Sequence, residues 1–335
     1  MHKHKQSQCK RKVKHRKNVM GLIIFCITVC IVFMFAYYQN LRKEISVRQE
    51  WLETVLTREK KWILENQDPE GEIYMNGSKA GDVNPYFACM AALGLLAETK
   101  NCPMTETEQK AVGRYLDWHT GVLLETDGKM GIYRKEGGEL IYKEKADSED
   151  GYLGMYLFLM GKYLEKTEST DLPESWKNGI SLALKKIQSL MQDGITQVSE
   201  ENTTVYLMDT LEVWKGLYEL ELAGLEDTQA ISEIRKKIQK QIEKIFWDDA
   251  NQRWRIIGNS DRYHQTEFYP DGVAQIYPLI YEFPVKEKKK QKVLYDQFTE
   301  RFQWQKLNKK RTGFLWAMTG MAAAQMRDIN NLVEL

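Results

Sequence analysis

Two kinds of helical pattern alternate along residues 45–326 of this 335-residue chain. One kind is amphipathic, and its clearest example repeats isoleucine every three or four residues, at Ile231, Ile234, Ile238, Ile242 and Ile245. The other kind is apolar on nearly every face, so it must be buried on every face. Strict alternation of the two predicts an all-α fold, an (α/α) toroid of five to six helical hairpins whose inner helices surround the axis.

Ten helices follow from this pattern. The amphipathic segments lie near 45–66, 106–119, 174–192, 231–245 and 287–302. The apolar segments are Tyr86–Ala97, Tyr152–Leu164, Val205–Leu222, Val273–Phe283 and Phe314–Met326. Some links contain short strand-like stretches, at Gly131–Arg134, Glu139–Lys143 and Arg253–Gly258. Long loops on one rim of such a toroid are a natural place for a functional site.

A hydrophobic segment precedes the helical region. Residues 19–38 contain no charged side chain, and twenty helical residues are about as long as the ~30 Å hydrocarbon core of a bilayer. Residues 1–18 contain eight Lys or Arg, which predicts a cytoplasmic basic tail, a single-pass anchor at 19–38 and an extracytoplasmic domain at 39–335. A cleaved signal peptide is the alternative, but its apolar region is usually shorter and a small-residue cleavage site is missing here.

Charge and cysteine content limit the partners and the environment. Without the eight tail cations, 40 basic and 47 acidic residues remain, a net charge of −7 that argues against nucleic acid as a partner. Only Cys89 and Cys102 follow the anchor, and they are compatible either with one disulfide or with two buried thiols. The predicted partners therefore include a lipid bilayer, through residues 19–38, and exclude nucleic acid.

Carboxylates are the main candidates for chemistry. Motifs for nucleotide phosphates, HExxH and CxxC are absent, and only His119 and His264 follow the anchor, which argues against a histidine metal site or a serine triad. We therefore predict no metal and no cofactor. Acids instead occur at or near the start of inner segments, at Asp82, Asp147, Asp150, Asp209 and Asp271, with Glu212 one turn after Asp209.

Inner helices of an alternating toroid all run the same way, so these acids are expected on one rim. Two carboxylates in an aromatic-lined cleft suffice for glycoside hydrolysis, one as proton donor and one as base or nucleophile. Aromatic candidates for stacking on sugar rings are Tyr86, Trp118, Tyr152, Trp214, Tyr269, Tyr277 and Trp316. Each group also has an ordinary structural explanation: Asp82 and Asp271 as helix caps, Asp209 in an internal ion pair, and most aromatic rings as core.

Short motifs resemble the six-hairpin (α/α) glycosidase superfamily between Trp51 and Met326. They are Glu70–Tyr74, Asn84–Ala88, Ala146–Tyr152 and Tyr269–Gln275. Glycoside hydrolase family eight is similar in two of them, and this resemblance implies Glu70 as general acid and Asp147 and Asp150 as an acidic motif opening an inner helix. Ile73 departs from the small residue of the first motif, and ten helices are two fewer than the full ring of twelve.

The sequence thus predicts a membrane-anchored glycosidase that cleaves a bacterial surface polysaccharide or oligosaccharide. The predicted roles are Asp150 as base or substrate-orienting acid, Glu70 as proton donor, and Asp147, Asp209 and Asp271 as supporting groups. A non-catalytic carbohydrate-binding or polysaccharide-assembly factor is the alternative, and it would use the same cleft. A purely structural scaffold is the third possibility, and it requires the acids to pair with Lys or Arg.

Overall fold

The computed structural model describes residues 38–39, 42–43, 45–75, 77, 81–169, 171–225, 228–258, 260, 267–285, 288–304 and 316–334. The chain forms two compact units, residues 1–59 and 60–335. In the first unit, residues 45–59 are helical. None of the described helices has the length and apolar character needed to cross a bilayer. The predicted anchor lies outside the described residues, apart from Tyr38.

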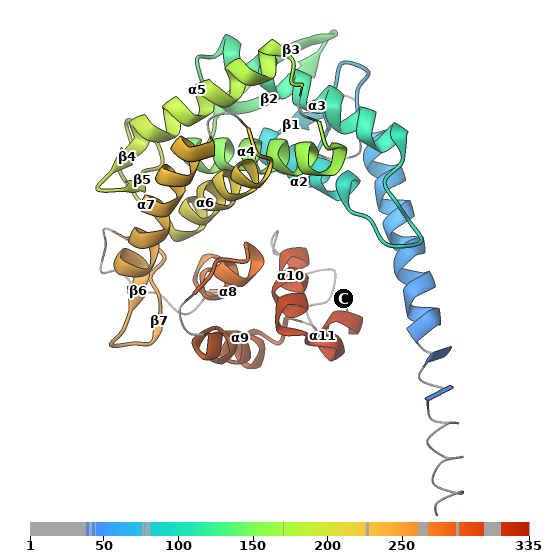
Figure 1. Ribbon diagram of the computed structural model, residues 1–335, viewed down its shortest axis with the longest axis vertical. Coiled ribbons are helices and arrows are strands. Elements are labelled where there is room, and N and C mark those ends of the chain that lie inside the picture. Colours follow the sequence, from blue (N-terminus) through green and yellow to red (C-terminus); the bar gives the residue numbers. More distant parts are fainter. Residues whose placement is uncertain are drawn as a thin grey trace, which may run out of the picture. The chain divides into compact units, whose positions relative to one another are not determined.

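The second unit is built from helices of the two predicted kinds. The inner helices are α2 (Pro85–Leu96), α4 (Glu149–Thr167), α6 (Leu207–Leu222), α8 (Val273–Ile280) and α10 (Trp316–Met326). The first four are largely buried, whereas Met321 of α10 is half exposed. The outer helices are α3 (Glu106–Glu125), α5 (Glu174–Leu190), α7 (Thr228–Phe246) and α9 (Lys288–Phe302). Successive inner helices contact each other, and α3, α5 and α7 cover α2, α4 and α6 (Figure 1). The predicted alternation of inner and outer helices is confirmed for these elements.

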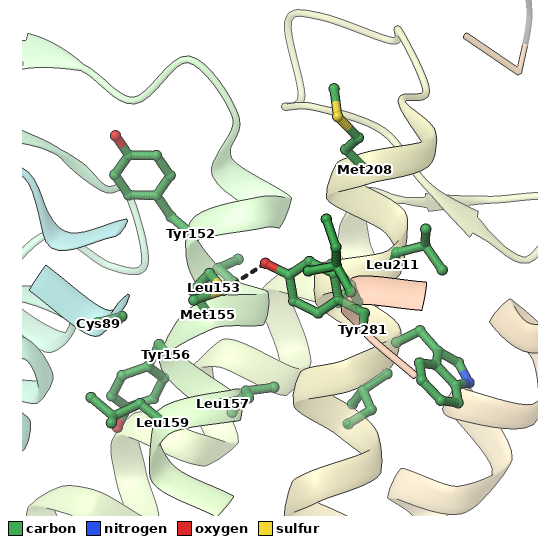
Figure 2. Packing of buried hydrophobic residues seen from close by; sticks show 14 of the residues in the cluster. Cys89, Tyr152, Leu153, Met155, Tyr156, Leu157, Leu159, Met208, Leu211 and Tyr281 are labelled. Atoms are coloured by element: carbon green, nitrogen blue, oxygen red, sulfur yellow. Dashed lines mark hydrogen bonds between the residues drawn. The ribbon is translucent and has the colours of Figure 1, made fainter. Parts of the chain in front are cut away.

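Glycines on α4 and α6 allow these two helices to pack closely against each other. A Cβ atom at Gly216 would lie 2.2 Å from the carbonyl oxygen of Gly154, and one at Gly161 would lie 2.5 Å from the carbonyl carbon of Glu219. Figure 2 shows the buried side chains beside this contact, with Leu153, Met155 and Leu157 on α4 and Leu211 on α6. Only glycine allows the two backbones to approach this closely.

Short antiparallel strands occupy the links that lead from an outer helix to the next inner one. β2 (Gly131–Glu136) and β3 (Glu139–Lys145) precede α4 and pair in the order β1-β2-β3 with β1 (Asp82–Val83). β4 (Met191–Gln192) and β5 (Ile195–Thr196) precede α6, and β6 (Trp247–Asp248) and β7 (Arg253–Trp254) precede α8. These strands therefore stand at the end of the domain where the inner helices begin.

Several local expectations need correction. Residues Val205 and Tyr206 are extended because they bond to the segment around Ile257, so α6 begins at Leu207, two residues later than predicted, and Asp209 lies in its first turn. Asp82 lies in β1 and binds Arg134 and Lys143, while Asn84 caps α2, so the capping role considered for Asp82 is wrong.

The five-residue π-helix η1 (Phe268–Gly272) and the short helix α11 (Ile329–Glu334) were not predicted. Cys89 is buried and Cys102 is half-buried, and the two form no disulfide in the described part of the chain. The disulfide alternative is therefore wrong.

Candidate active site

One small pocket gathers six of the predicted site residues, two acids and four tyrosines, at the end where the inner helices begin. It is lined from the β1–α2 link, α2, the start of α4, the start of α6, η1 and α8. Its acids are Asp147, Asp209 and Glu212. Its remaining lining residues are aromatic, polar or thioether side chains: Tyr86, Phe87, Tyr152, Tyr269, Tyr277, Asn84, Ser148 and Met208.

The start of α4 places two acids differently. Ser148 is the N-cap, and its hydroxyl accepts a hydrogen bond from the Gly151 amide and donates one of 2.8 Å to Oδ1 of Asp150. Asp150 is fully buried, and its Oδ2 has no hydrogen-bond partner among the described residues. Burial raises the pKa of Asp150 to about 6, against the lowering effect of the hydroxyls of Thr196 and Ser148. Asp147, three residues earlier, is exposed at the pocket.

Glu212 is held by three tyrosines from two other inner helices. Its Oε1 accepts hydrogen bonds from Tyr86, from Tyr277 at 2.6 Å and from Tyr281 at 3.3 Å. Only 2% of Glu212 is exposed, and this burial raises its pKa to about 8, although the tyrosine hydroxyls act in the opposite direction. Glu212 is therefore largely protonated at neutral pH.

Asp209 lies one turn before Glu212 on the same face of α6 and is half-buried in the pocket. Burial raises the pKa of Asp209 well above its ordinary value, and the negative charges of Asp150 and Glu212 raise it further. Burial thus raises the pKa values of both Asp209 and Glu212, while Asp147 faces solvent. Carboxyl groups with such different environments are a common feature of hydrolytic sites.

The other predicted residues lie elsewhere. Glu70 is exposed and binds Lys135 at 2.7 Å, together with Asp68 and Glu72. Asp271 is buried, accepts a hydrogen bond from the Glu267 amide and lines a different cavity, beside α9.

Two of the predicted tryptophans, Trp214 and Trp118, also stand apart from this pocket. Trp214 is buried, stacks on Tyr218, packs against Phe283 and is not a lining residue of this pocket. Trp118 is half-buried among Tyr115, His119 and Tyr133 and is not a lining residue. Trp316 begins α10, and its side chain lies outside the described part.

Glu212 lines the pocket although the sequence marks it only as the neighbour of Asp209 and not as a predicted site residue. Its spacing of three residues from Asp209 was the available signal, because residues i and i+3 share a face of a helix. Asn84, Ser148 and Met208 also line the pocket without having been proposed for it. Asn84 and Ser148 are the N-caps of α2 and α4, and such capping residues occur at the start of many helices, so they give no specific signal of a site.

Among the described residues, one group of acids is close enough together to hold a metal ion. It is formed by Asp68, Glu70 and Glu72, whose ligand atoms lie within 4.8 Å of one another. The ammonium group of Lys135 lies within 3.4 Å of all three carboxylates. This lysine therefore already supplies the positive charge that a metal would bring.

Glu212→Gln is expected to stabilise the protein at pH 8 and to have a smaller effect at pH 5. The folded pKa of Glu212, about 8, exceeds the ordinary value of 4.5 that applies in the unfolded chain. Between these values the folded state binds the extra proton, so unfolding becomes easier as pH rises. Melting temperatures of variant and wild type at both pH values measure the effect, expected to be about 2–4 °C at pH 8. A stabilisation that is equal at both pH values would contradict the assignment.

The fold resembles those of solved glycosidases. A wild-type glycosidase aligns with a TM-score of 0.58 at 11% identity, covering 84% of this chain and 81% of that one. A glycosidase variant with one glutamate replaced by alanine aligns at 0.60 and 12% identity, and another such variant, in complex with glucose, at 0.60 and 11%, with the same coverage. The chain has the fold of these glycosidases.

No protein-family profile and no curated protein sequence matches it. The resemblance to the six-hairpin glycosidases is thus confirmed for the fold, and membership of family eight stays a prediction.

Proposed function

We propose that this protein is a membrane-anchored glycoside hydrolase with an (α/α) toroid domain, acting on a polysaccharide or oligosaccharide without a cofactor. The observation that carries the proposal is the pocket itself. Three carboxyl groups, Asp147, Asp209 and Glu212, meet beside four tyrosine rings at the end where the inner helices begin. The likeness to glycosidases in fold supports the same reaction class, since polysaccharide-cleaving sites need paired carboxyl groups and ring faces.

Asp209 is the proposed proton donor. It lines the pocket, and burial raises its pKa well above the ordinary value, which is the direction that a general acid requires. Its proton would pass to the glycosidic oxygen as the bond from that oxygen to the anomeric carbon breaks. Asp147 is the proposed base: it would take a proton from a water molecule whose oxygen bonds to the anomeric carbon. One water is consumed, and one new reducing end is formed.

Asp150 and Glu212 have supporting roles in this proposal. Asp150 is too deeply buried to reach substrate, but its charge raises the pKa of Asp209. Glu212, fixed by its tyrosines, forms one wall of the pocket. Tyr86, Tyr152 and Tyr269 are the proposed sugar-stacking rings, of which Tyr269 is half exposed.

Two elements of the proposal rest on the sequence. The anchor at residues 19–38, with an N-terminal cytoplasmic tail, would hold the domain at the outer face of a cell membrane. Glu70 remains a proposed proton donor only through the resemblance to family eight, and its ion pair with Lys135 would have to open for that role. Asp271 would act from the neighbouring cavity.

Release of reducing ends tests the proposal. The full-length chain, purified in a mild detergent, is incubated with bacterial surface polysaccharides and with oligosaccharides of defined linkage. Time-dependent release is expected for at least one of them. Binding without release on any of them would favour the carbohydrate-binding or assembly role, in which the same acids would accept hydrogen bonds from sugar hydroxyls.

A further inference from the structure

A stripe of exposed apolar side chains runs along the helical part of the first unit. Tyr38, Ile45 and Leu52 follow one another at intervals of seven residues, and they are 48%, 55% and 56% exposed. Residues 38–39, 42–43 and 45–59 are helical, and the guanidinium of Arg42 lies 4.9 Å from the ring centroid of Tyr38, a contact typical of helical residues four apart. Seven residues are about 20° short of two helical turns, so these three side chains form one seam.

The residues between the seam positions complete a heptad pattern. With the seam at position a, position d holds Leu41, Arg48 and Val55. Apolar residues at a and d, repeated every seven residues, are the pattern of helices that pair in a left-handed coiled coil. Arg48 is the polar interruption of this pattern, and such interruptions fix the register of a coiled coil at a cost in stability.

The partner that this seam fits is an identical helix. Two copies anchored through residues 19–38 would enter one bilayer in the same orientation, so their helices would leave it parallel and in the same register. Position g of one helix then lies beside position e of the other. This arrangement would bring Trp51, which is 54% exposed, next to the half-buried Leu56 of the second copy. The bilayer itself is a poorer cover, because Leu52 lies fourteen residues beyond the anchor, about 21 Å along a straight helix.

We propose that residues 38–59 pair with the same residues of a second copy of this chain, in a parallel two-stranded coiled coil at the membrane. This inference goes beyond the proposed function and does not depend on it. Three heptads associate weakly as free peptides, because isolated helices of this length are marginal. Confinement of both copies to one membrane raises their effective concentration, and burial of the seam supplies the free energy of association.

The mass of the full-length chain, measured by sedimentation equilibrium in a density-matched mild detergent, tests the inference. The wild type is expected to be a dimer. Ile45→Glu combined with Leu52→Glu keeps a good helix former at both positions but places like charges opposite each other, and it should weaken dimerisation by about 10²-fold or more. Val47→Glu is the matched control. Val47 is 58% exposed but lies about 200° around the helix from Ile45, so its variant should remain a dimer.

Disulfide formation tests the parallel register. Leu52→Cys and Val47→Cys are each introduced into the full-length chain with Cys9, Cys26 and Cys30 replaced by serine, and the same chain without an added cysteine gives the baseline. Mild oxidation is expected to link two copies at position 52, where identical residues face each other, and to give little more than the baseline at position 47.

A monomeric wild type would overturn the inference. A dimer that is unaffected by the two seam substitutions would also overturn it, because another part of the chain would then hold the copies together. Equal disulfide formation at positions 47 and 52 would contradict the seam. Each of these results would leave the pocket and its proposed reaction standing.

Discussion

Asp209→Asn is expected to lower the rate of glycosidic bond cleavage by about 10²–10⁴-fold, the usual contribution of a general acid. Asparagine keeps the size of the side chain but has no acidic proton to deliver to the leaving oxygen. Saccharide binding should change little, because Asp209 is half-buried and its neighbours in the pocket remain. Initial rates of reducing-end release, beside binding measured on the same oligosaccharide, separate the two effects.

The matched control is Glu201→Gln, which removes an exposed acid outside the pocket and should retain wild-type turnover. A substrate with a very acidic leaving group, such as a dinitrophenyl glycoside, needs little protonation, so Asp209→Asn should recover most of its rate on it. Turnover that is unchanged in Asp209→Asn on ordinary oligosaccharides would remove Asp209 from the role of proton donor.

Gly216→Ala is expected to destabilise the helical domain by about 3 kcal/mol. The added methyl carbon would lie 2.2 Å from the carbonyl oxygen of Gly154, which belongs to the backbone of α4 and cannot rotate away. α4 and α6 would have to separate, and Asp150 and Glu212, which these helices bring together, would separate with them. Thermal and denaturant unfolding followed by circular dichroism measures the loss.

Gly121→Ala provides the control for this substitution. Gly121 lies within α3, and a Cβ atom there would meet nothing within 4 Å. Alanine at that position should be neutral or stabilising by up to about 1 kcal/mol, from its better helix propensity. Equal stability of the Gly216 and Gly121 variants would show that the α4–α6 contact is more tolerant than its geometry indicates.

The helical architecture could be predicted because it depends on local pattern. Amphipathic and fully apolar segments differ within a window of a dozen residues, and burial follows from that difference alone. The helix from 106 extends further than predicted, to Glu125, and α4 begins three residues earlier than Tyr152. Ser148 caps α4, and capping depends on the link before the helix as well as on the helix itself.

The site was only partly predictable, because its contacts join distant parts of the chain. Tyr86, Tyr277 and Tyr281 lie 126, 65 and 69 residues from Glu212, and no local pattern connects them. Helix geometry could have excluded Trp214 as a residue of this pocket. At about 100° per residue, Trp214 points roughly 200° away from Glu212, so the two cannot both face the pocket. Trp214 instead packs on Tyr218 and contacts Gln239 of α7.

Asp271 illustrates the remaining difficulty. Its position before an apolar inner helix is equivalent to that of Asp150 in sequence, and both are buried. The π-helix η1, however, precedes α8 and includes Asp271, so its side chain bonds to Glu267 and lines the cavity beside α9. A spacing rule that treats each inner helix alike misses such a local change of geometry.

The central claim is that the pocket formed by α2, α4, α6 and α8 is where a saccharide is bound and cleaved. The most direct test is an experimental structure of the Asp209→Asn variant with an oligosaccharide that the wild type cleaves. We expect the glycosidic oxygen within hydrogen-bond distance of the side chain at position 209, with Asp147 on the opposite side of the ring. A saccharide bound elsewhere, for example in the cavity lined by Asp271 or beside Glu70, would contradict the claim.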